Sequence, residues 1–503
     1  IDEYNLNRVV VASCTPRTHE PLFQETIRQA GLNPYLFEMA NIRDQCSWVH
    51  MALGEEATEK SMDLVRMAVA KVALAEPLTS IPLDVISKAL VVGGGIAGMT
   101  SALTLANQGY EVFLLEKTPS LGGNALKIGR DLYGNDVNQH LDNMIEKVTH
   151  HPLITVFRNS HLTKVDGFIG NFISTIEHHN GNGAETSEVE HGAVIVATGG
   201  SENTPDEYLY GQNDNVMTLL EVSQALQTDD FAVPETVVMI QCVGSREPDH
   251  NYCSRVCCAG AIKNAIRMKT RNPDANIFIL YRDIRSYGFR EHYYTQAREM
   301  GINFIRYDLD LKPSVTQEDG QLLVKVYDPI LRAVLHIPAG LLVLSSRINP
   351  NPDNDRLSQL FKVPLNSEKF FLEAHVKLRP VEFATDGVYL CGLAHYPKDM
   401  KETISQAMAT AGRAATVLSK EKIEAAGRIA YVNELRCSGC GACVTVCAYN
   451  AISIDEERQV AVINEAMCKG CGACTATCRG TAIRLHGFED EQILNIINAV
   501  VIA

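Results

Sequence analysis

The feature that most limits how this chain can fold is a duplicated run of cysteines near its C-terminal end. Segment 437–447 has the spacing C-x2-C-x2-C-x3-C, and segment 468–478 repeats it. Three thiolates on one tight loop can bind three corners of an iron–sulfur cubane, while the fourth cysteine opens a segment that faces a neighbouring cluster. The duplication therefore predicts two related units that pack against each other.

The double spacing is that of bacterial ferredoxins with two [4Fe–4S] clusters, and it predicts crossed ligation. Each cluster takes three cysteines from one run and the fourth from the other run. The expected ligand sets are Cys437, Cys440, Cys443 and Cys478 for one cluster, and Cys468, Cys471, Cys474 and Cys447 for the other. Glycines between the cysteines allow backbone amides to point at the sulfurs. Zinc binding and eight buried thiols are the alternatives, and the double spacing disfavours both.

Length and charge limit what the rest of the chain can be. A chain of 503 residues is too long for one core, so we expect about three domains. A net charge of −15 without a long basic run disfavours nucleic acid and anionic membranes as partners. No run reaches the roughly 18 apolar residues that a membrane helix needs, so we expect a cytoplasmic protein without membrane insertion. The sequence enters a predicted strand almost at once, so we also expect the natural N-terminus to lie upstream of Ile1.

A glycine-rich turn after a predicted strand at 89–92 indicates a dinucleotide site. Gly93, Gly95 and Gly98 form G-x-G-x-x-G, and Glu116 ends the next strand, where a carboxylate binds ribose hydroxyls. The helix N-terminus after Gly95 would bind the pyrophosphate. Thr-Gly and Gly-x-x-x-x-Gly segments downstream complete a pattern typical of FAD, which we favour over NAD or a plain tight turn. The further residues expected at this cofactor are Ala97, Lys117, Gly122, Gly123, Asn124, Thr198, Gly199 and Gly392.

Four cysteines occupy the loop where a second nucleotide-binding turn would be expected. The strand at 237–241 is followed by a turn with the single glycine Gly244, so a pyrophosphate cannot approach the backbone closely. The loop cysteines are Cys242, Cys253, Cys257 and Cys258, enough for one more [4Fe–4S] cluster. We infer that a cluster replaces the pyridine nucleotide as electron partner of the flavin. The alternatives are a redox disulfide, although the loop has no C-x-x-C, and zinc, which cannot exchange electrons with a flavin.

Segments 9–23, 33–50 and 252–258 resemble the A subunit of soluble heterodisulfide reductase, and the similarity extends over nearly the whole chain. The resemblance implies a thioredoxin-reductase-like flavoprotein core whose FAD bifurcates electrons between a high-potential and a low-potential route. It also implies that Lys263 lies near the reactive edge of the isoalloxazine as a catalytic residue. The alternative interpretation of Lys263 is a solvated lysine on a helix.

The same resemblance implies further ligands. Cys14 and Cys46 would be two ligands of an N-terminal [4Fe–4S] cluster, although two cysteines cannot complete a cubane and a pair of buried thiols is the alternative. Lys398 and Asp399 resemble a loop next to the flavin, and the helix after them could stabilise an anionic flavin with its N-terminus. Many family members carry an extra ferredoxin insert in the flavin domain, but segment 123–192 contains no cysteine, so we expect this insert to be absent.

These observations predict an α/β protein with a flavoprotein core of two dinucleotide-binding-type, thioredoxin-reductase-like domains and an α+β two-[4Fe–4S] ferredoxin domain. The expected boundaries are 1–80 for an N-terminal α/β domain with a partial iron–sulfur site, 81–235 and 376–425 for the two parts of the FAD domain, 236–375 for the second dinucleotide-binding-like domain with its cluster, 426–488 for the ferredoxin domain and 489–503 for a C-terminal helix.

The function predicted by the resemblance is that of an electron-bifurcating oxidoreductase within a larger complex. The expected partners are the other subunits of a heterodisulfide-reductase-like complex, a hydrogenase or formate dehydrogenase module, ferredoxin and, within the complex, a second copy of the chain. One alternative is a relay without bifurcation, as in class II benzoyl-CoA reductase complexes. Another alternative, an NAD(P)H:ferredoxin oxidoreductase, is disfavoured by the missing second glycine turn.

Overall fold

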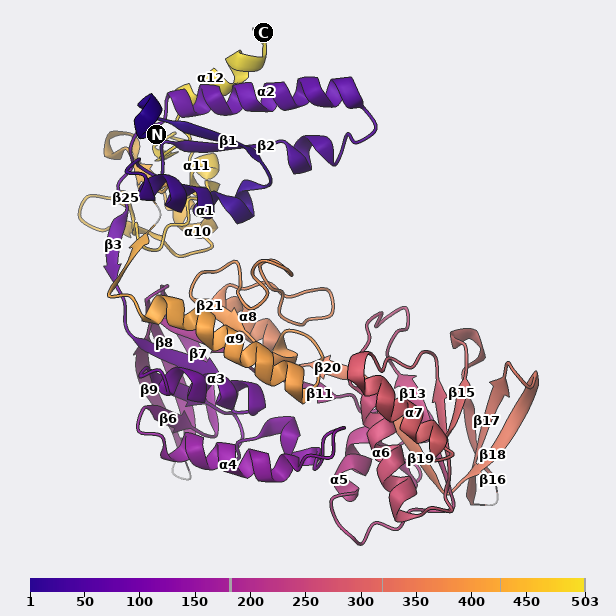
Figure 1. Ribbon diagram of the computed structural model, residues 1–503. Coiled ribbons are helices and arrows are strands. Elements are labelled where there is room, and N and C mark those ends of the chain that lie inside the picture. The colour runs from indigo at the N-terminus through magenta and orange to yellow at the C-terminus, as the bar shows by residue number, and fades with distance from the viewer. Residues whose placement is uncertain (181–182, 319, 426, 502–503) are drawn as a thin grey trace. The chain divides into compact units, whose positions relative to one another are not determined.

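The computed structural model describes residues 1–180, 183–318, 320–425 and 427–501 (Figure 1). The chain divides into two compact units. We call Val85–Lys420 the larger unit, and Ile1–Asp84 with Glu421–Ala503 the smaller unit. Among the described residues, no helix combines the length and the apolar character needed to span a membrane.

The larger unit begins with a five-stranded parallel sheet, the first sheet, in the order β21-β10-β4-β5-β6. Its strands are β4 (Lys88–Val92), β5 (Glu111–Leu115), β6 (Ile154–Phe157), β10 (Ala193–Val196) and β21 (Val388–Leu390). The strands are apolar and largely buried because both faces of the sheet are covered. One face packs against α3 (Ile96–Ala106), α4 (Val137–His150) and α9 (Met400–Leu418). The other packs against α8 (Asn354–Phe361) and the antiparallel strands β7 (Ser160–Phe168), β8 (Asn171–Asn180) and β9 (Gly183–His191).

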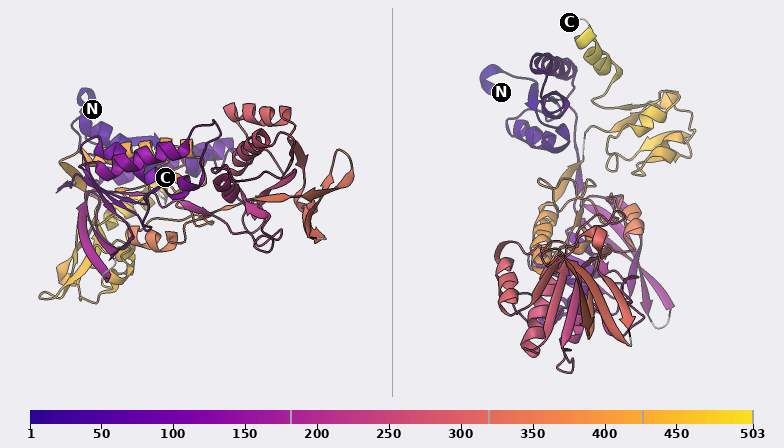
Figure 2. Two further views of the ribbon diagram at one scale, coloured as in Figure 1. Left: turned by 90° about the horizontal axis from the view of Figure 1, so that it is seen from below. Right: turned by 90° about the vertical axis from the view of Figure 1, so that its right-hand side faces the viewer.

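A second five-stranded parallel sheet in the same unit has the order β12-β19-β13-β14-β15. The domain that contains it faces the viewer in the right-hand view of Figure 2. Its strands are β12 (Val216–Thr218), β13 (Thr236–Val243), β14 (Asn276–Tyr281), β15 (Asn303–Arg306) and β19 (Leu341–Ser346). One face packs against α5 (Leu219–Ala225), α6 (Cys257–Arg271) and α7 (Glu291–Glu299). The other packs against the antiparallel strands β16 (Ser314–Glu318), β17 (Gln321–Asp328) and β18 (Ala333–Ala339). The chain passes between the two sheets at β11 (Gly200–Glu202) and β20 (Ile348–Pro350), which pair antiparallel.

Two details of the second sheet differ from the sequence prediction. Strand β12 pairs with β19, so the second sheet begins well before the expected boundary at 235/236. The pairing depends on a contact with a strand far along the chain, which no local pattern announces. Helix α6 begins at Cys257, within the segment that was expected to be a loop. Cys257 and Cys258 therefore lie in the first turn of this helix, not in the loop before it.

The smaller unit combines the two ends of the chain. Its N-terminal part contains the parallel strands β1 (Val9–Ser13) and β2 (Phe37–Asn41) with helices α1 (Pro16–Gln29) and α2 (Gly54–Ala73). Its C-terminal part contains β23 (Ala430–Val432), α10 (Ala442–Val446), β24 (Ile452–Asp455), β25 (Val460–Ile463), α11 (Ala473–Thr477), β26 (Ile483–Leu485) and α12 (Asp490–Val501). Strands β3 (Ile81–Asp84) and β22 (Lys422–Ala425) pair antiparallel.

Helix α12 lies along α2 (Figure 1). The side-chain amide of Gln492 donates to the carbonyl of Leu74 at 3.0 Å, and that of Asn495 donates to the carbonyl of Ala70 at 2.7 Å. The segments expected as three separate domains, 1–80, 426–488 and 489–503, therefore pack as one unit. Separate motifs along the sequence could not indicate this packing.

The glycine turn after β4 suggests a test of close packing. A Cβ on Gly98 would lie 1.7 Å from the carbonyl oxygen of Gly93, so alanine cannot fit unless the turn moves. We expect Gly98→Ala to lower the FAD content and the melting temperature. The matched control is Gly412→Ala in α9, where a Cβ would meet no atom within 4 Å. This variant should be stabilised by about 1 kcal/mol, the helix preference of alanine over glycine. A Gly98→Ala protein with the FAD content and melting temperature of the parent would refute this role.

Candidate active site and cluster sites

A cavity of about 950 Å³ lies between the two sheets of the larger unit. Its volume is within the range typical of cofactor sites. Most residues predicted to bind the flavin line it, together with the predicted catalytic lysine. These are Gly93, Gly95, Ala97, Glu116, Lys117, Gly122, Gly123, Asn124, Thr198, Gly199, Lys263, Lys398 and Asp399. The structure thus brings together residues from both sheets and from segments more than three hundred positions apart.

Two predicted residues, Gly98 and Gly392, do not line the cavity and support its walls instead. Gly98 packs against the turn at Gly93, as described above. The amide of Gly392 donates to Oε1 of Gln406 at 3.0 Å, and its carbonyl accepts from Lys398 Nζ at 2.5 Å. A glycine is needed at 392 because its φ is +69° and a Cβ would lie 2.8 Å from that of Ala97.

Glu116 is fixed at the end of β5 by hydrogen bonds. Its carboxylate accepts from the amide of Gly94 at 2.7 Å and from the amide and hydroxyl of Thr118, each at 2.8 Å. The side chain is buried at the cavity wall. An ionised carboxylate has about four lone-pair sites, so it can still accept hydrogen bonds from hydroxyl groups of a bound ligand. This geometry suits the predicted contact with ribose.

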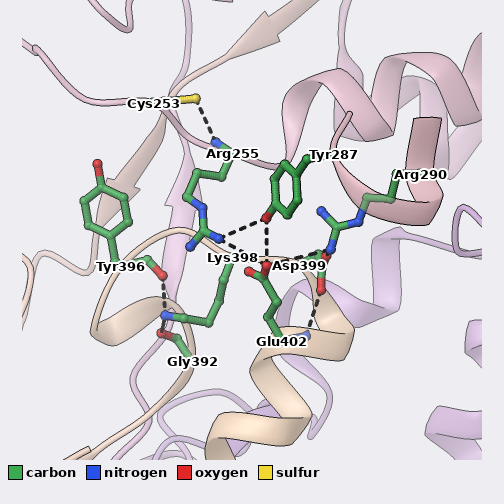
Figure 3. Close-up of polar contacts among 9 residues, drawn as sticks. All are labelled: Cys253, Arg255, Tyr287, Arg290, Gly392, Tyr396, Lys398, Asp399 and Glu402. Carbon is green, nitrogen blue, oxygen red and sulfur yellow. Dashed lines mark hydrogen bonds and ion pairs between the residues drawn. The ribbon is translucent and has the colours of Figure 1, made fainter. Parts of the chain in front are cut away.

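Two buried lysines give the cavity positive charge. Lys263 comes from α6, and its Nζ donates to Ser223 Oγ at 3.2 Å and to the carbonyl of Ile128 at 3.4 Å. Lys398 precedes α9, and its Nζ donates to the carbonyls of Gly392 and Tyr396 (Figure 3). Burial lowers the pKa of each lysine to about 8. Neither forms an ion pair with any residue that the structure describes, so an anionic ligand would be favoured here.

The cysteines of the second sheet form one group, which we call the cysteine loop (242–258). Cys242 is the second-last residue of strand β13 and has φ +64°, Cys253 lies in the loop, and Cys257 and Cys258 open α6. The pKa of Cys257 is raised well above its usual value, first by burial and then by the three neighbouring thiols. Val256 and Ala259, on either side of the cysteine pair, line the cavity. The cysteine group therefore lies directly behind the cavity wall.

Unpaired polar groups around the cysteine loop fit a cluster. Gln241, Ser346 and Arg246 each have a buried side-chain atom without a hydrogen-bond partner among the described residues. Gln241 precedes Cys242, and the backbone carbonyl of Ser346 lies 3.9 Å from Cys257 Sγ. Buried polar groups are nearly always hydrogen-bonded, and the sulfides of an iron–sulfur cluster accept hydrogen bonds.

Arginines surround the same loop. Nη2 of Arg246 lies 2.6 Å from Asp283, and its guanidinium lowers the pKa of Cys242 against the larger raising effect of burial. Arg285 acts in the same sense on Cys258, whose pKa burial raises to about 11. These cations would stabilise the negative charge of thiolates and of a cluster that they bind.

One of the two predicted C-terminal ligand sets lies together in the structure, and the crossed ligation of both clusters stays a prediction. A cavity in the smaller unit is lined by Cys447 of the first run together with Cys468, Cys471 and Cys474 of the second. Backbone amides donate to the sulfurs of Cys437, Cys447, Cys468 and Cys478 at 3.3 or 3.4 Å. Gly441 and Gly472 adopt left-handed φ values of +74° and +77° at the start of α10 and α11, which lets the cysteine loops close.

The two N-terminal cysteines lie at the same end of the β1–β2 pair. Cys14 follows β1, and its Sγ accepts from Arg43 at 3.4 Å. Cys46 is buried in the π-helical turn after β2, and its Sγ donates to the carbonyl of Ala57 at 2.8 Å. The thiols have different partners, and their role as cluster ligands stays a prediction.

Comparison with known proteins identifies the family. Residues 87–240 match the family described as pyridine nucleotide-disulphide oxidoreductase, and residues 436–482 match the 4Fe-4S dicluster domain. One of two iron-sulfur A subunits of the CoB–CoM heterodisulfide reductase of Methanopyrus kandleri is 36% identical over 552 aligned residues, which cover 91% of this chain and 83% of that protein. The chain belongs to the family of heterodisulfide reductase A subunits.

Other matches are similar in extent. The A subunit of the H(2):CoB-CoM heterodisulfide,ferredoxin reductase of Methanothermobacter thermautotrophicus is 35% identical over 91% of this chain and 83% of its own. The crystal structure of Lactococcus lactis thioredoxin reductase aligns with a TM-score of 0.46 at 15% identity, over 66% of this chain and 99% of that one.

Family membership confirms several predictions. The chain is an oxidoreductase with a flavoprotein core that binds FAD and a C-terminal domain with two [4Fe–4S] clusters. The predicted fold class, a thioredoxin-reductase-like core followed by a two-cluster domain, is confirmed as well.

Several cavity residues were not predicted from the sequence. Arg130, Tyr133, Arg290, Asp353 and Arg356 all line the cavity, and Asp353 forms an ion pair with Lys117 at 3.2 Å. They come from loops and helices of both sheets and belong to no spaced motif. No sequence signal could have found them without the fold.

Crossed ligation can be tested by counting iron. If Cys440 and Cys478 serve the same cluster, a protein with both changed to alanine should lose the iron of one cluster. The matched control changes Cys440 and Cys447, which should serve different clusters, and it should lose the iron of both. Iron and sulfide analysis of the purified proteins measures this. If instead the variant at Cys440 and Cys478 loses the iron of both clusters and the control loses that of one, each run binds its own cluster.

The buried Lys263 predicts a pH dependence of stability in the protein freed of FAD. Its pKa is about 8 in the fold but 10.5 in an exposed chain, so between these pH values the unfolded state binds more protons. Stability from this group therefore rises with pH across that window. Lys263→Met should be more stable than the parent at neutral pH, and this advantage should shrink toward pH 10.5. Urea unfolding across the window measures it, and a difference independent of pH would contradict it.

Proposed function

We propose that this chain is the flavin-based electron-bifurcating subunit of a heterodisulfide-reductase-like complex. The observation that carries the proposal is the place of the cysteine loop, because Val256 of this loop and Ala259 directly after it form part of the flavin cavity wall. A pyridine nucleotide would need a glycine turn after β13, and that position holds Cys242 instead. Electrons from the cavity would then leave through cysteine-bound clusters.

The residues around the cavity have separate tasks in this proposal. FAD, when bound, supplies a centre that exchanges electrons in pairs or singly. The amides at the start of α3 would bind its pyrophosphate, and Glu116 would bind its ribose. Lys263 and Lys398 would stabilise negative charge on its ring, which they can do strongly because both are buried. The N-terminus of α9 would act in the same sense.

Bifurcation needs two outlets of different potential, and the chain has two kinds of cysteine site. Arg246, Arg282 and Arg285 surround the cysteine loop and would favour the reduced, more negative form of a cluster. We therefore propose this site as the higher-potential outlet. The two-cluster domain would be the route toward ferredoxin.

The name of the Methanothermobacter relative contains both hydrogen and ferredoxin. By analogy, the proposed partners are the other subunits of such a complex, ferredoxin, and a hydrogenase or formate dehydrogenase module.

A redox titration of the flavin in the intact complex tests the proposal. Bifurcation requires crossed one-electron potentials, with the second electron taken up at a higher potential than the first. Potentials in the ordinary order would favour a relay without bifurcation. Optical titration with mediators, run beside iron analysis, separates these outcomes.

Replacement of Lys263 tests the charge that the cavity supplies. Lys263→Met keeps most of the side-chain volume and removes the ammonium. It should lower the flavin potential by an amount equivalent to about 1–4 kcal/mol and slow turnover. The effect is large because the dielectric constant around a buried charge is low. The control is Lys269→Met on the same helix, whose Nζ bonds to the carbonyl of Ala275 away from the cavity. Iron content should match the parent in both. An unchanged flavin potential in Lys263→Met would remove this residue from the mechanism.

A further inference from the structure

Arg255 and Arg290, from segments that pack with the second sheet, contact the first turn of α9 (Figure 3). This helix borders the flavin cavity. Nη2 of Arg255 donates to Glu402 Oε1 at 3.1 Å and to the hydroxyl of Tyr287 at 3.1 Å. That hydroxyl in turn donates to Glu402 at 2.9 Å. Arg290 pairs with Asp399 and lies 3.8 Å from Glu402.

Arg255 also contacts the cysteine loop directly. Its backbone amide donates to Cys253 Sγ at 3.3 Å, and it lies two residues before Cys257. Its φ of +60° is uncommon for a residue with a side chain, and such a conformation persists only where the surroundings fix it. One residue thus contacts a proposed cluster ligand through its backbone and α9 through its side chain.

The carboxylates that receive these arginines belong to the cavity-facing end of α9. Asp399 caps the helix, because its side chain accepts from the amide of Glu402 at 2.8 Å. Lys398, whose side chain lines the cavity, immediately precedes this cap. Because Asp399 directly follows Lys398, a displacement of this end of α9 would also displace the cavity wall.

Burial makes this network more than a surface ion pair. The Arg290 side chain is only 12% exposed, and those of Arg255 and Glu402 are 36% and 31% exposed. Exposed pairs contribute little because water screens them, whereas networks of partly buried charges and hydrogen bonds are coupled more strongly. The chain itself passes between the two sheets at β11 and β20, a narrow connection that these contacts supplement.

We propose that Arg255 is a positioning residue that clamps the cysteine loop to α9 and, together with Arg290, fixes the separation between the cysteine group and the flavin cavity. The clamp matters for electron transfer only if the cysteines hold a cluster, so that consequence rests on the proposed function. Electron tunnelling slows steeply as the gap between donor and acceptor widens. A hinge motion between the sheets would widen this gap, and the clamp opposes it.

Amide hydrogen exchange of the full chain tests the clamp without any assumption about clusters. The variants are Arg255→Met, Glu402→Gln and the double variant, with Arg298→Met on α7 as control, because the Arg298 guanidinium lies over the ring of Tyr294 on the same helix. Each single variant should raise exchange by about fivefold in segments 251–258 and 399–405, and the double variant no further. Glu402→Gln is decisive because it leaves the cysteine loop's sequence intact. Unchanged exchange in 251–258 in this variant overturns the proposal.

A second measurement links the clamp to function. Iron and FAD contents of Glu402→Gln should match the parent, while electrons should pass more slowly from the flavin to the cluster at 242–258, as followed by freeze-quench EPR. Exchanging the charges, Arg255→Glu with Glu402→Arg, should restore part of the rate. An unchanged rate with full iron content overturns the positioning role. A parent protein without iron at 242–258 overturns the proposed function instead, and the exchange data then decide the clamp by themselves.

Discussion

Parallel strands place all their carboxyl ends at one edge of a sheet, and this constraint determines where the chemistry of the larger unit gathers. In the first sheet the glycine turn follows β4, Glu116 follows β5 and Thr198 follows β10. In the second sheet the cysteine loop begins at the end of β13, and Ser346 ends β19. Both edges contribute to one cavity or to its wall. The flavin site and the cysteine group are therefore neighbours because of topology, although their residues are widely separated in sequence.

The charges around the cavity and the cysteine loop are opposite in sign to the net charge of the chain. The net charge is −15, yet the cavity holds two buried lysines and the cysteine loop is surrounded by arginines. Burying Lys263 and Lys398 without an ion pair to any described residue destabilises the cofactor-free fold, as their lowered pKa values indicate. An anionic cofactor offsets that cost. Under the proposed function, the same positive potential would also favour reduction, since each added electron increases the negative charge at these sites.

Sequence reasoning succeeded where the chemistry depends on local spacing. The cysteine repeat and the G-x-G-x-x-G turn need residues at fixed short intervals, so they indicated the two-cluster domain and the FAD site directly. It failed where function depends on tertiary contacts. Gly392 belongs to a flavin-type segment but packs behind the wall, and Arg290 and Asp353 reach the cavity from segments without any motif. Strand β12 joins the second sheet through a partner that lies over a hundred residues away, so no local pattern could locate the domain boundary.

Replacing a nucleotide by a cluster would also change what the second sheet must do. A pyridine nucleotide has to enter and leave, which needs an open cleft and a domain that can move. A cluster bound by four cysteines is permanent, so motion would only alter the distance that electrons must cross. The contacts of Arg255 and Arg290 with the first turn of α9 suit the second situation, because they tie the cysteine loop to the cavity wall. Under the proposed function, the cysteine loop and the arginine contacts would be two parts of one adaptation, in which a nucleotide-binding domain becomes a fixed electron outlet.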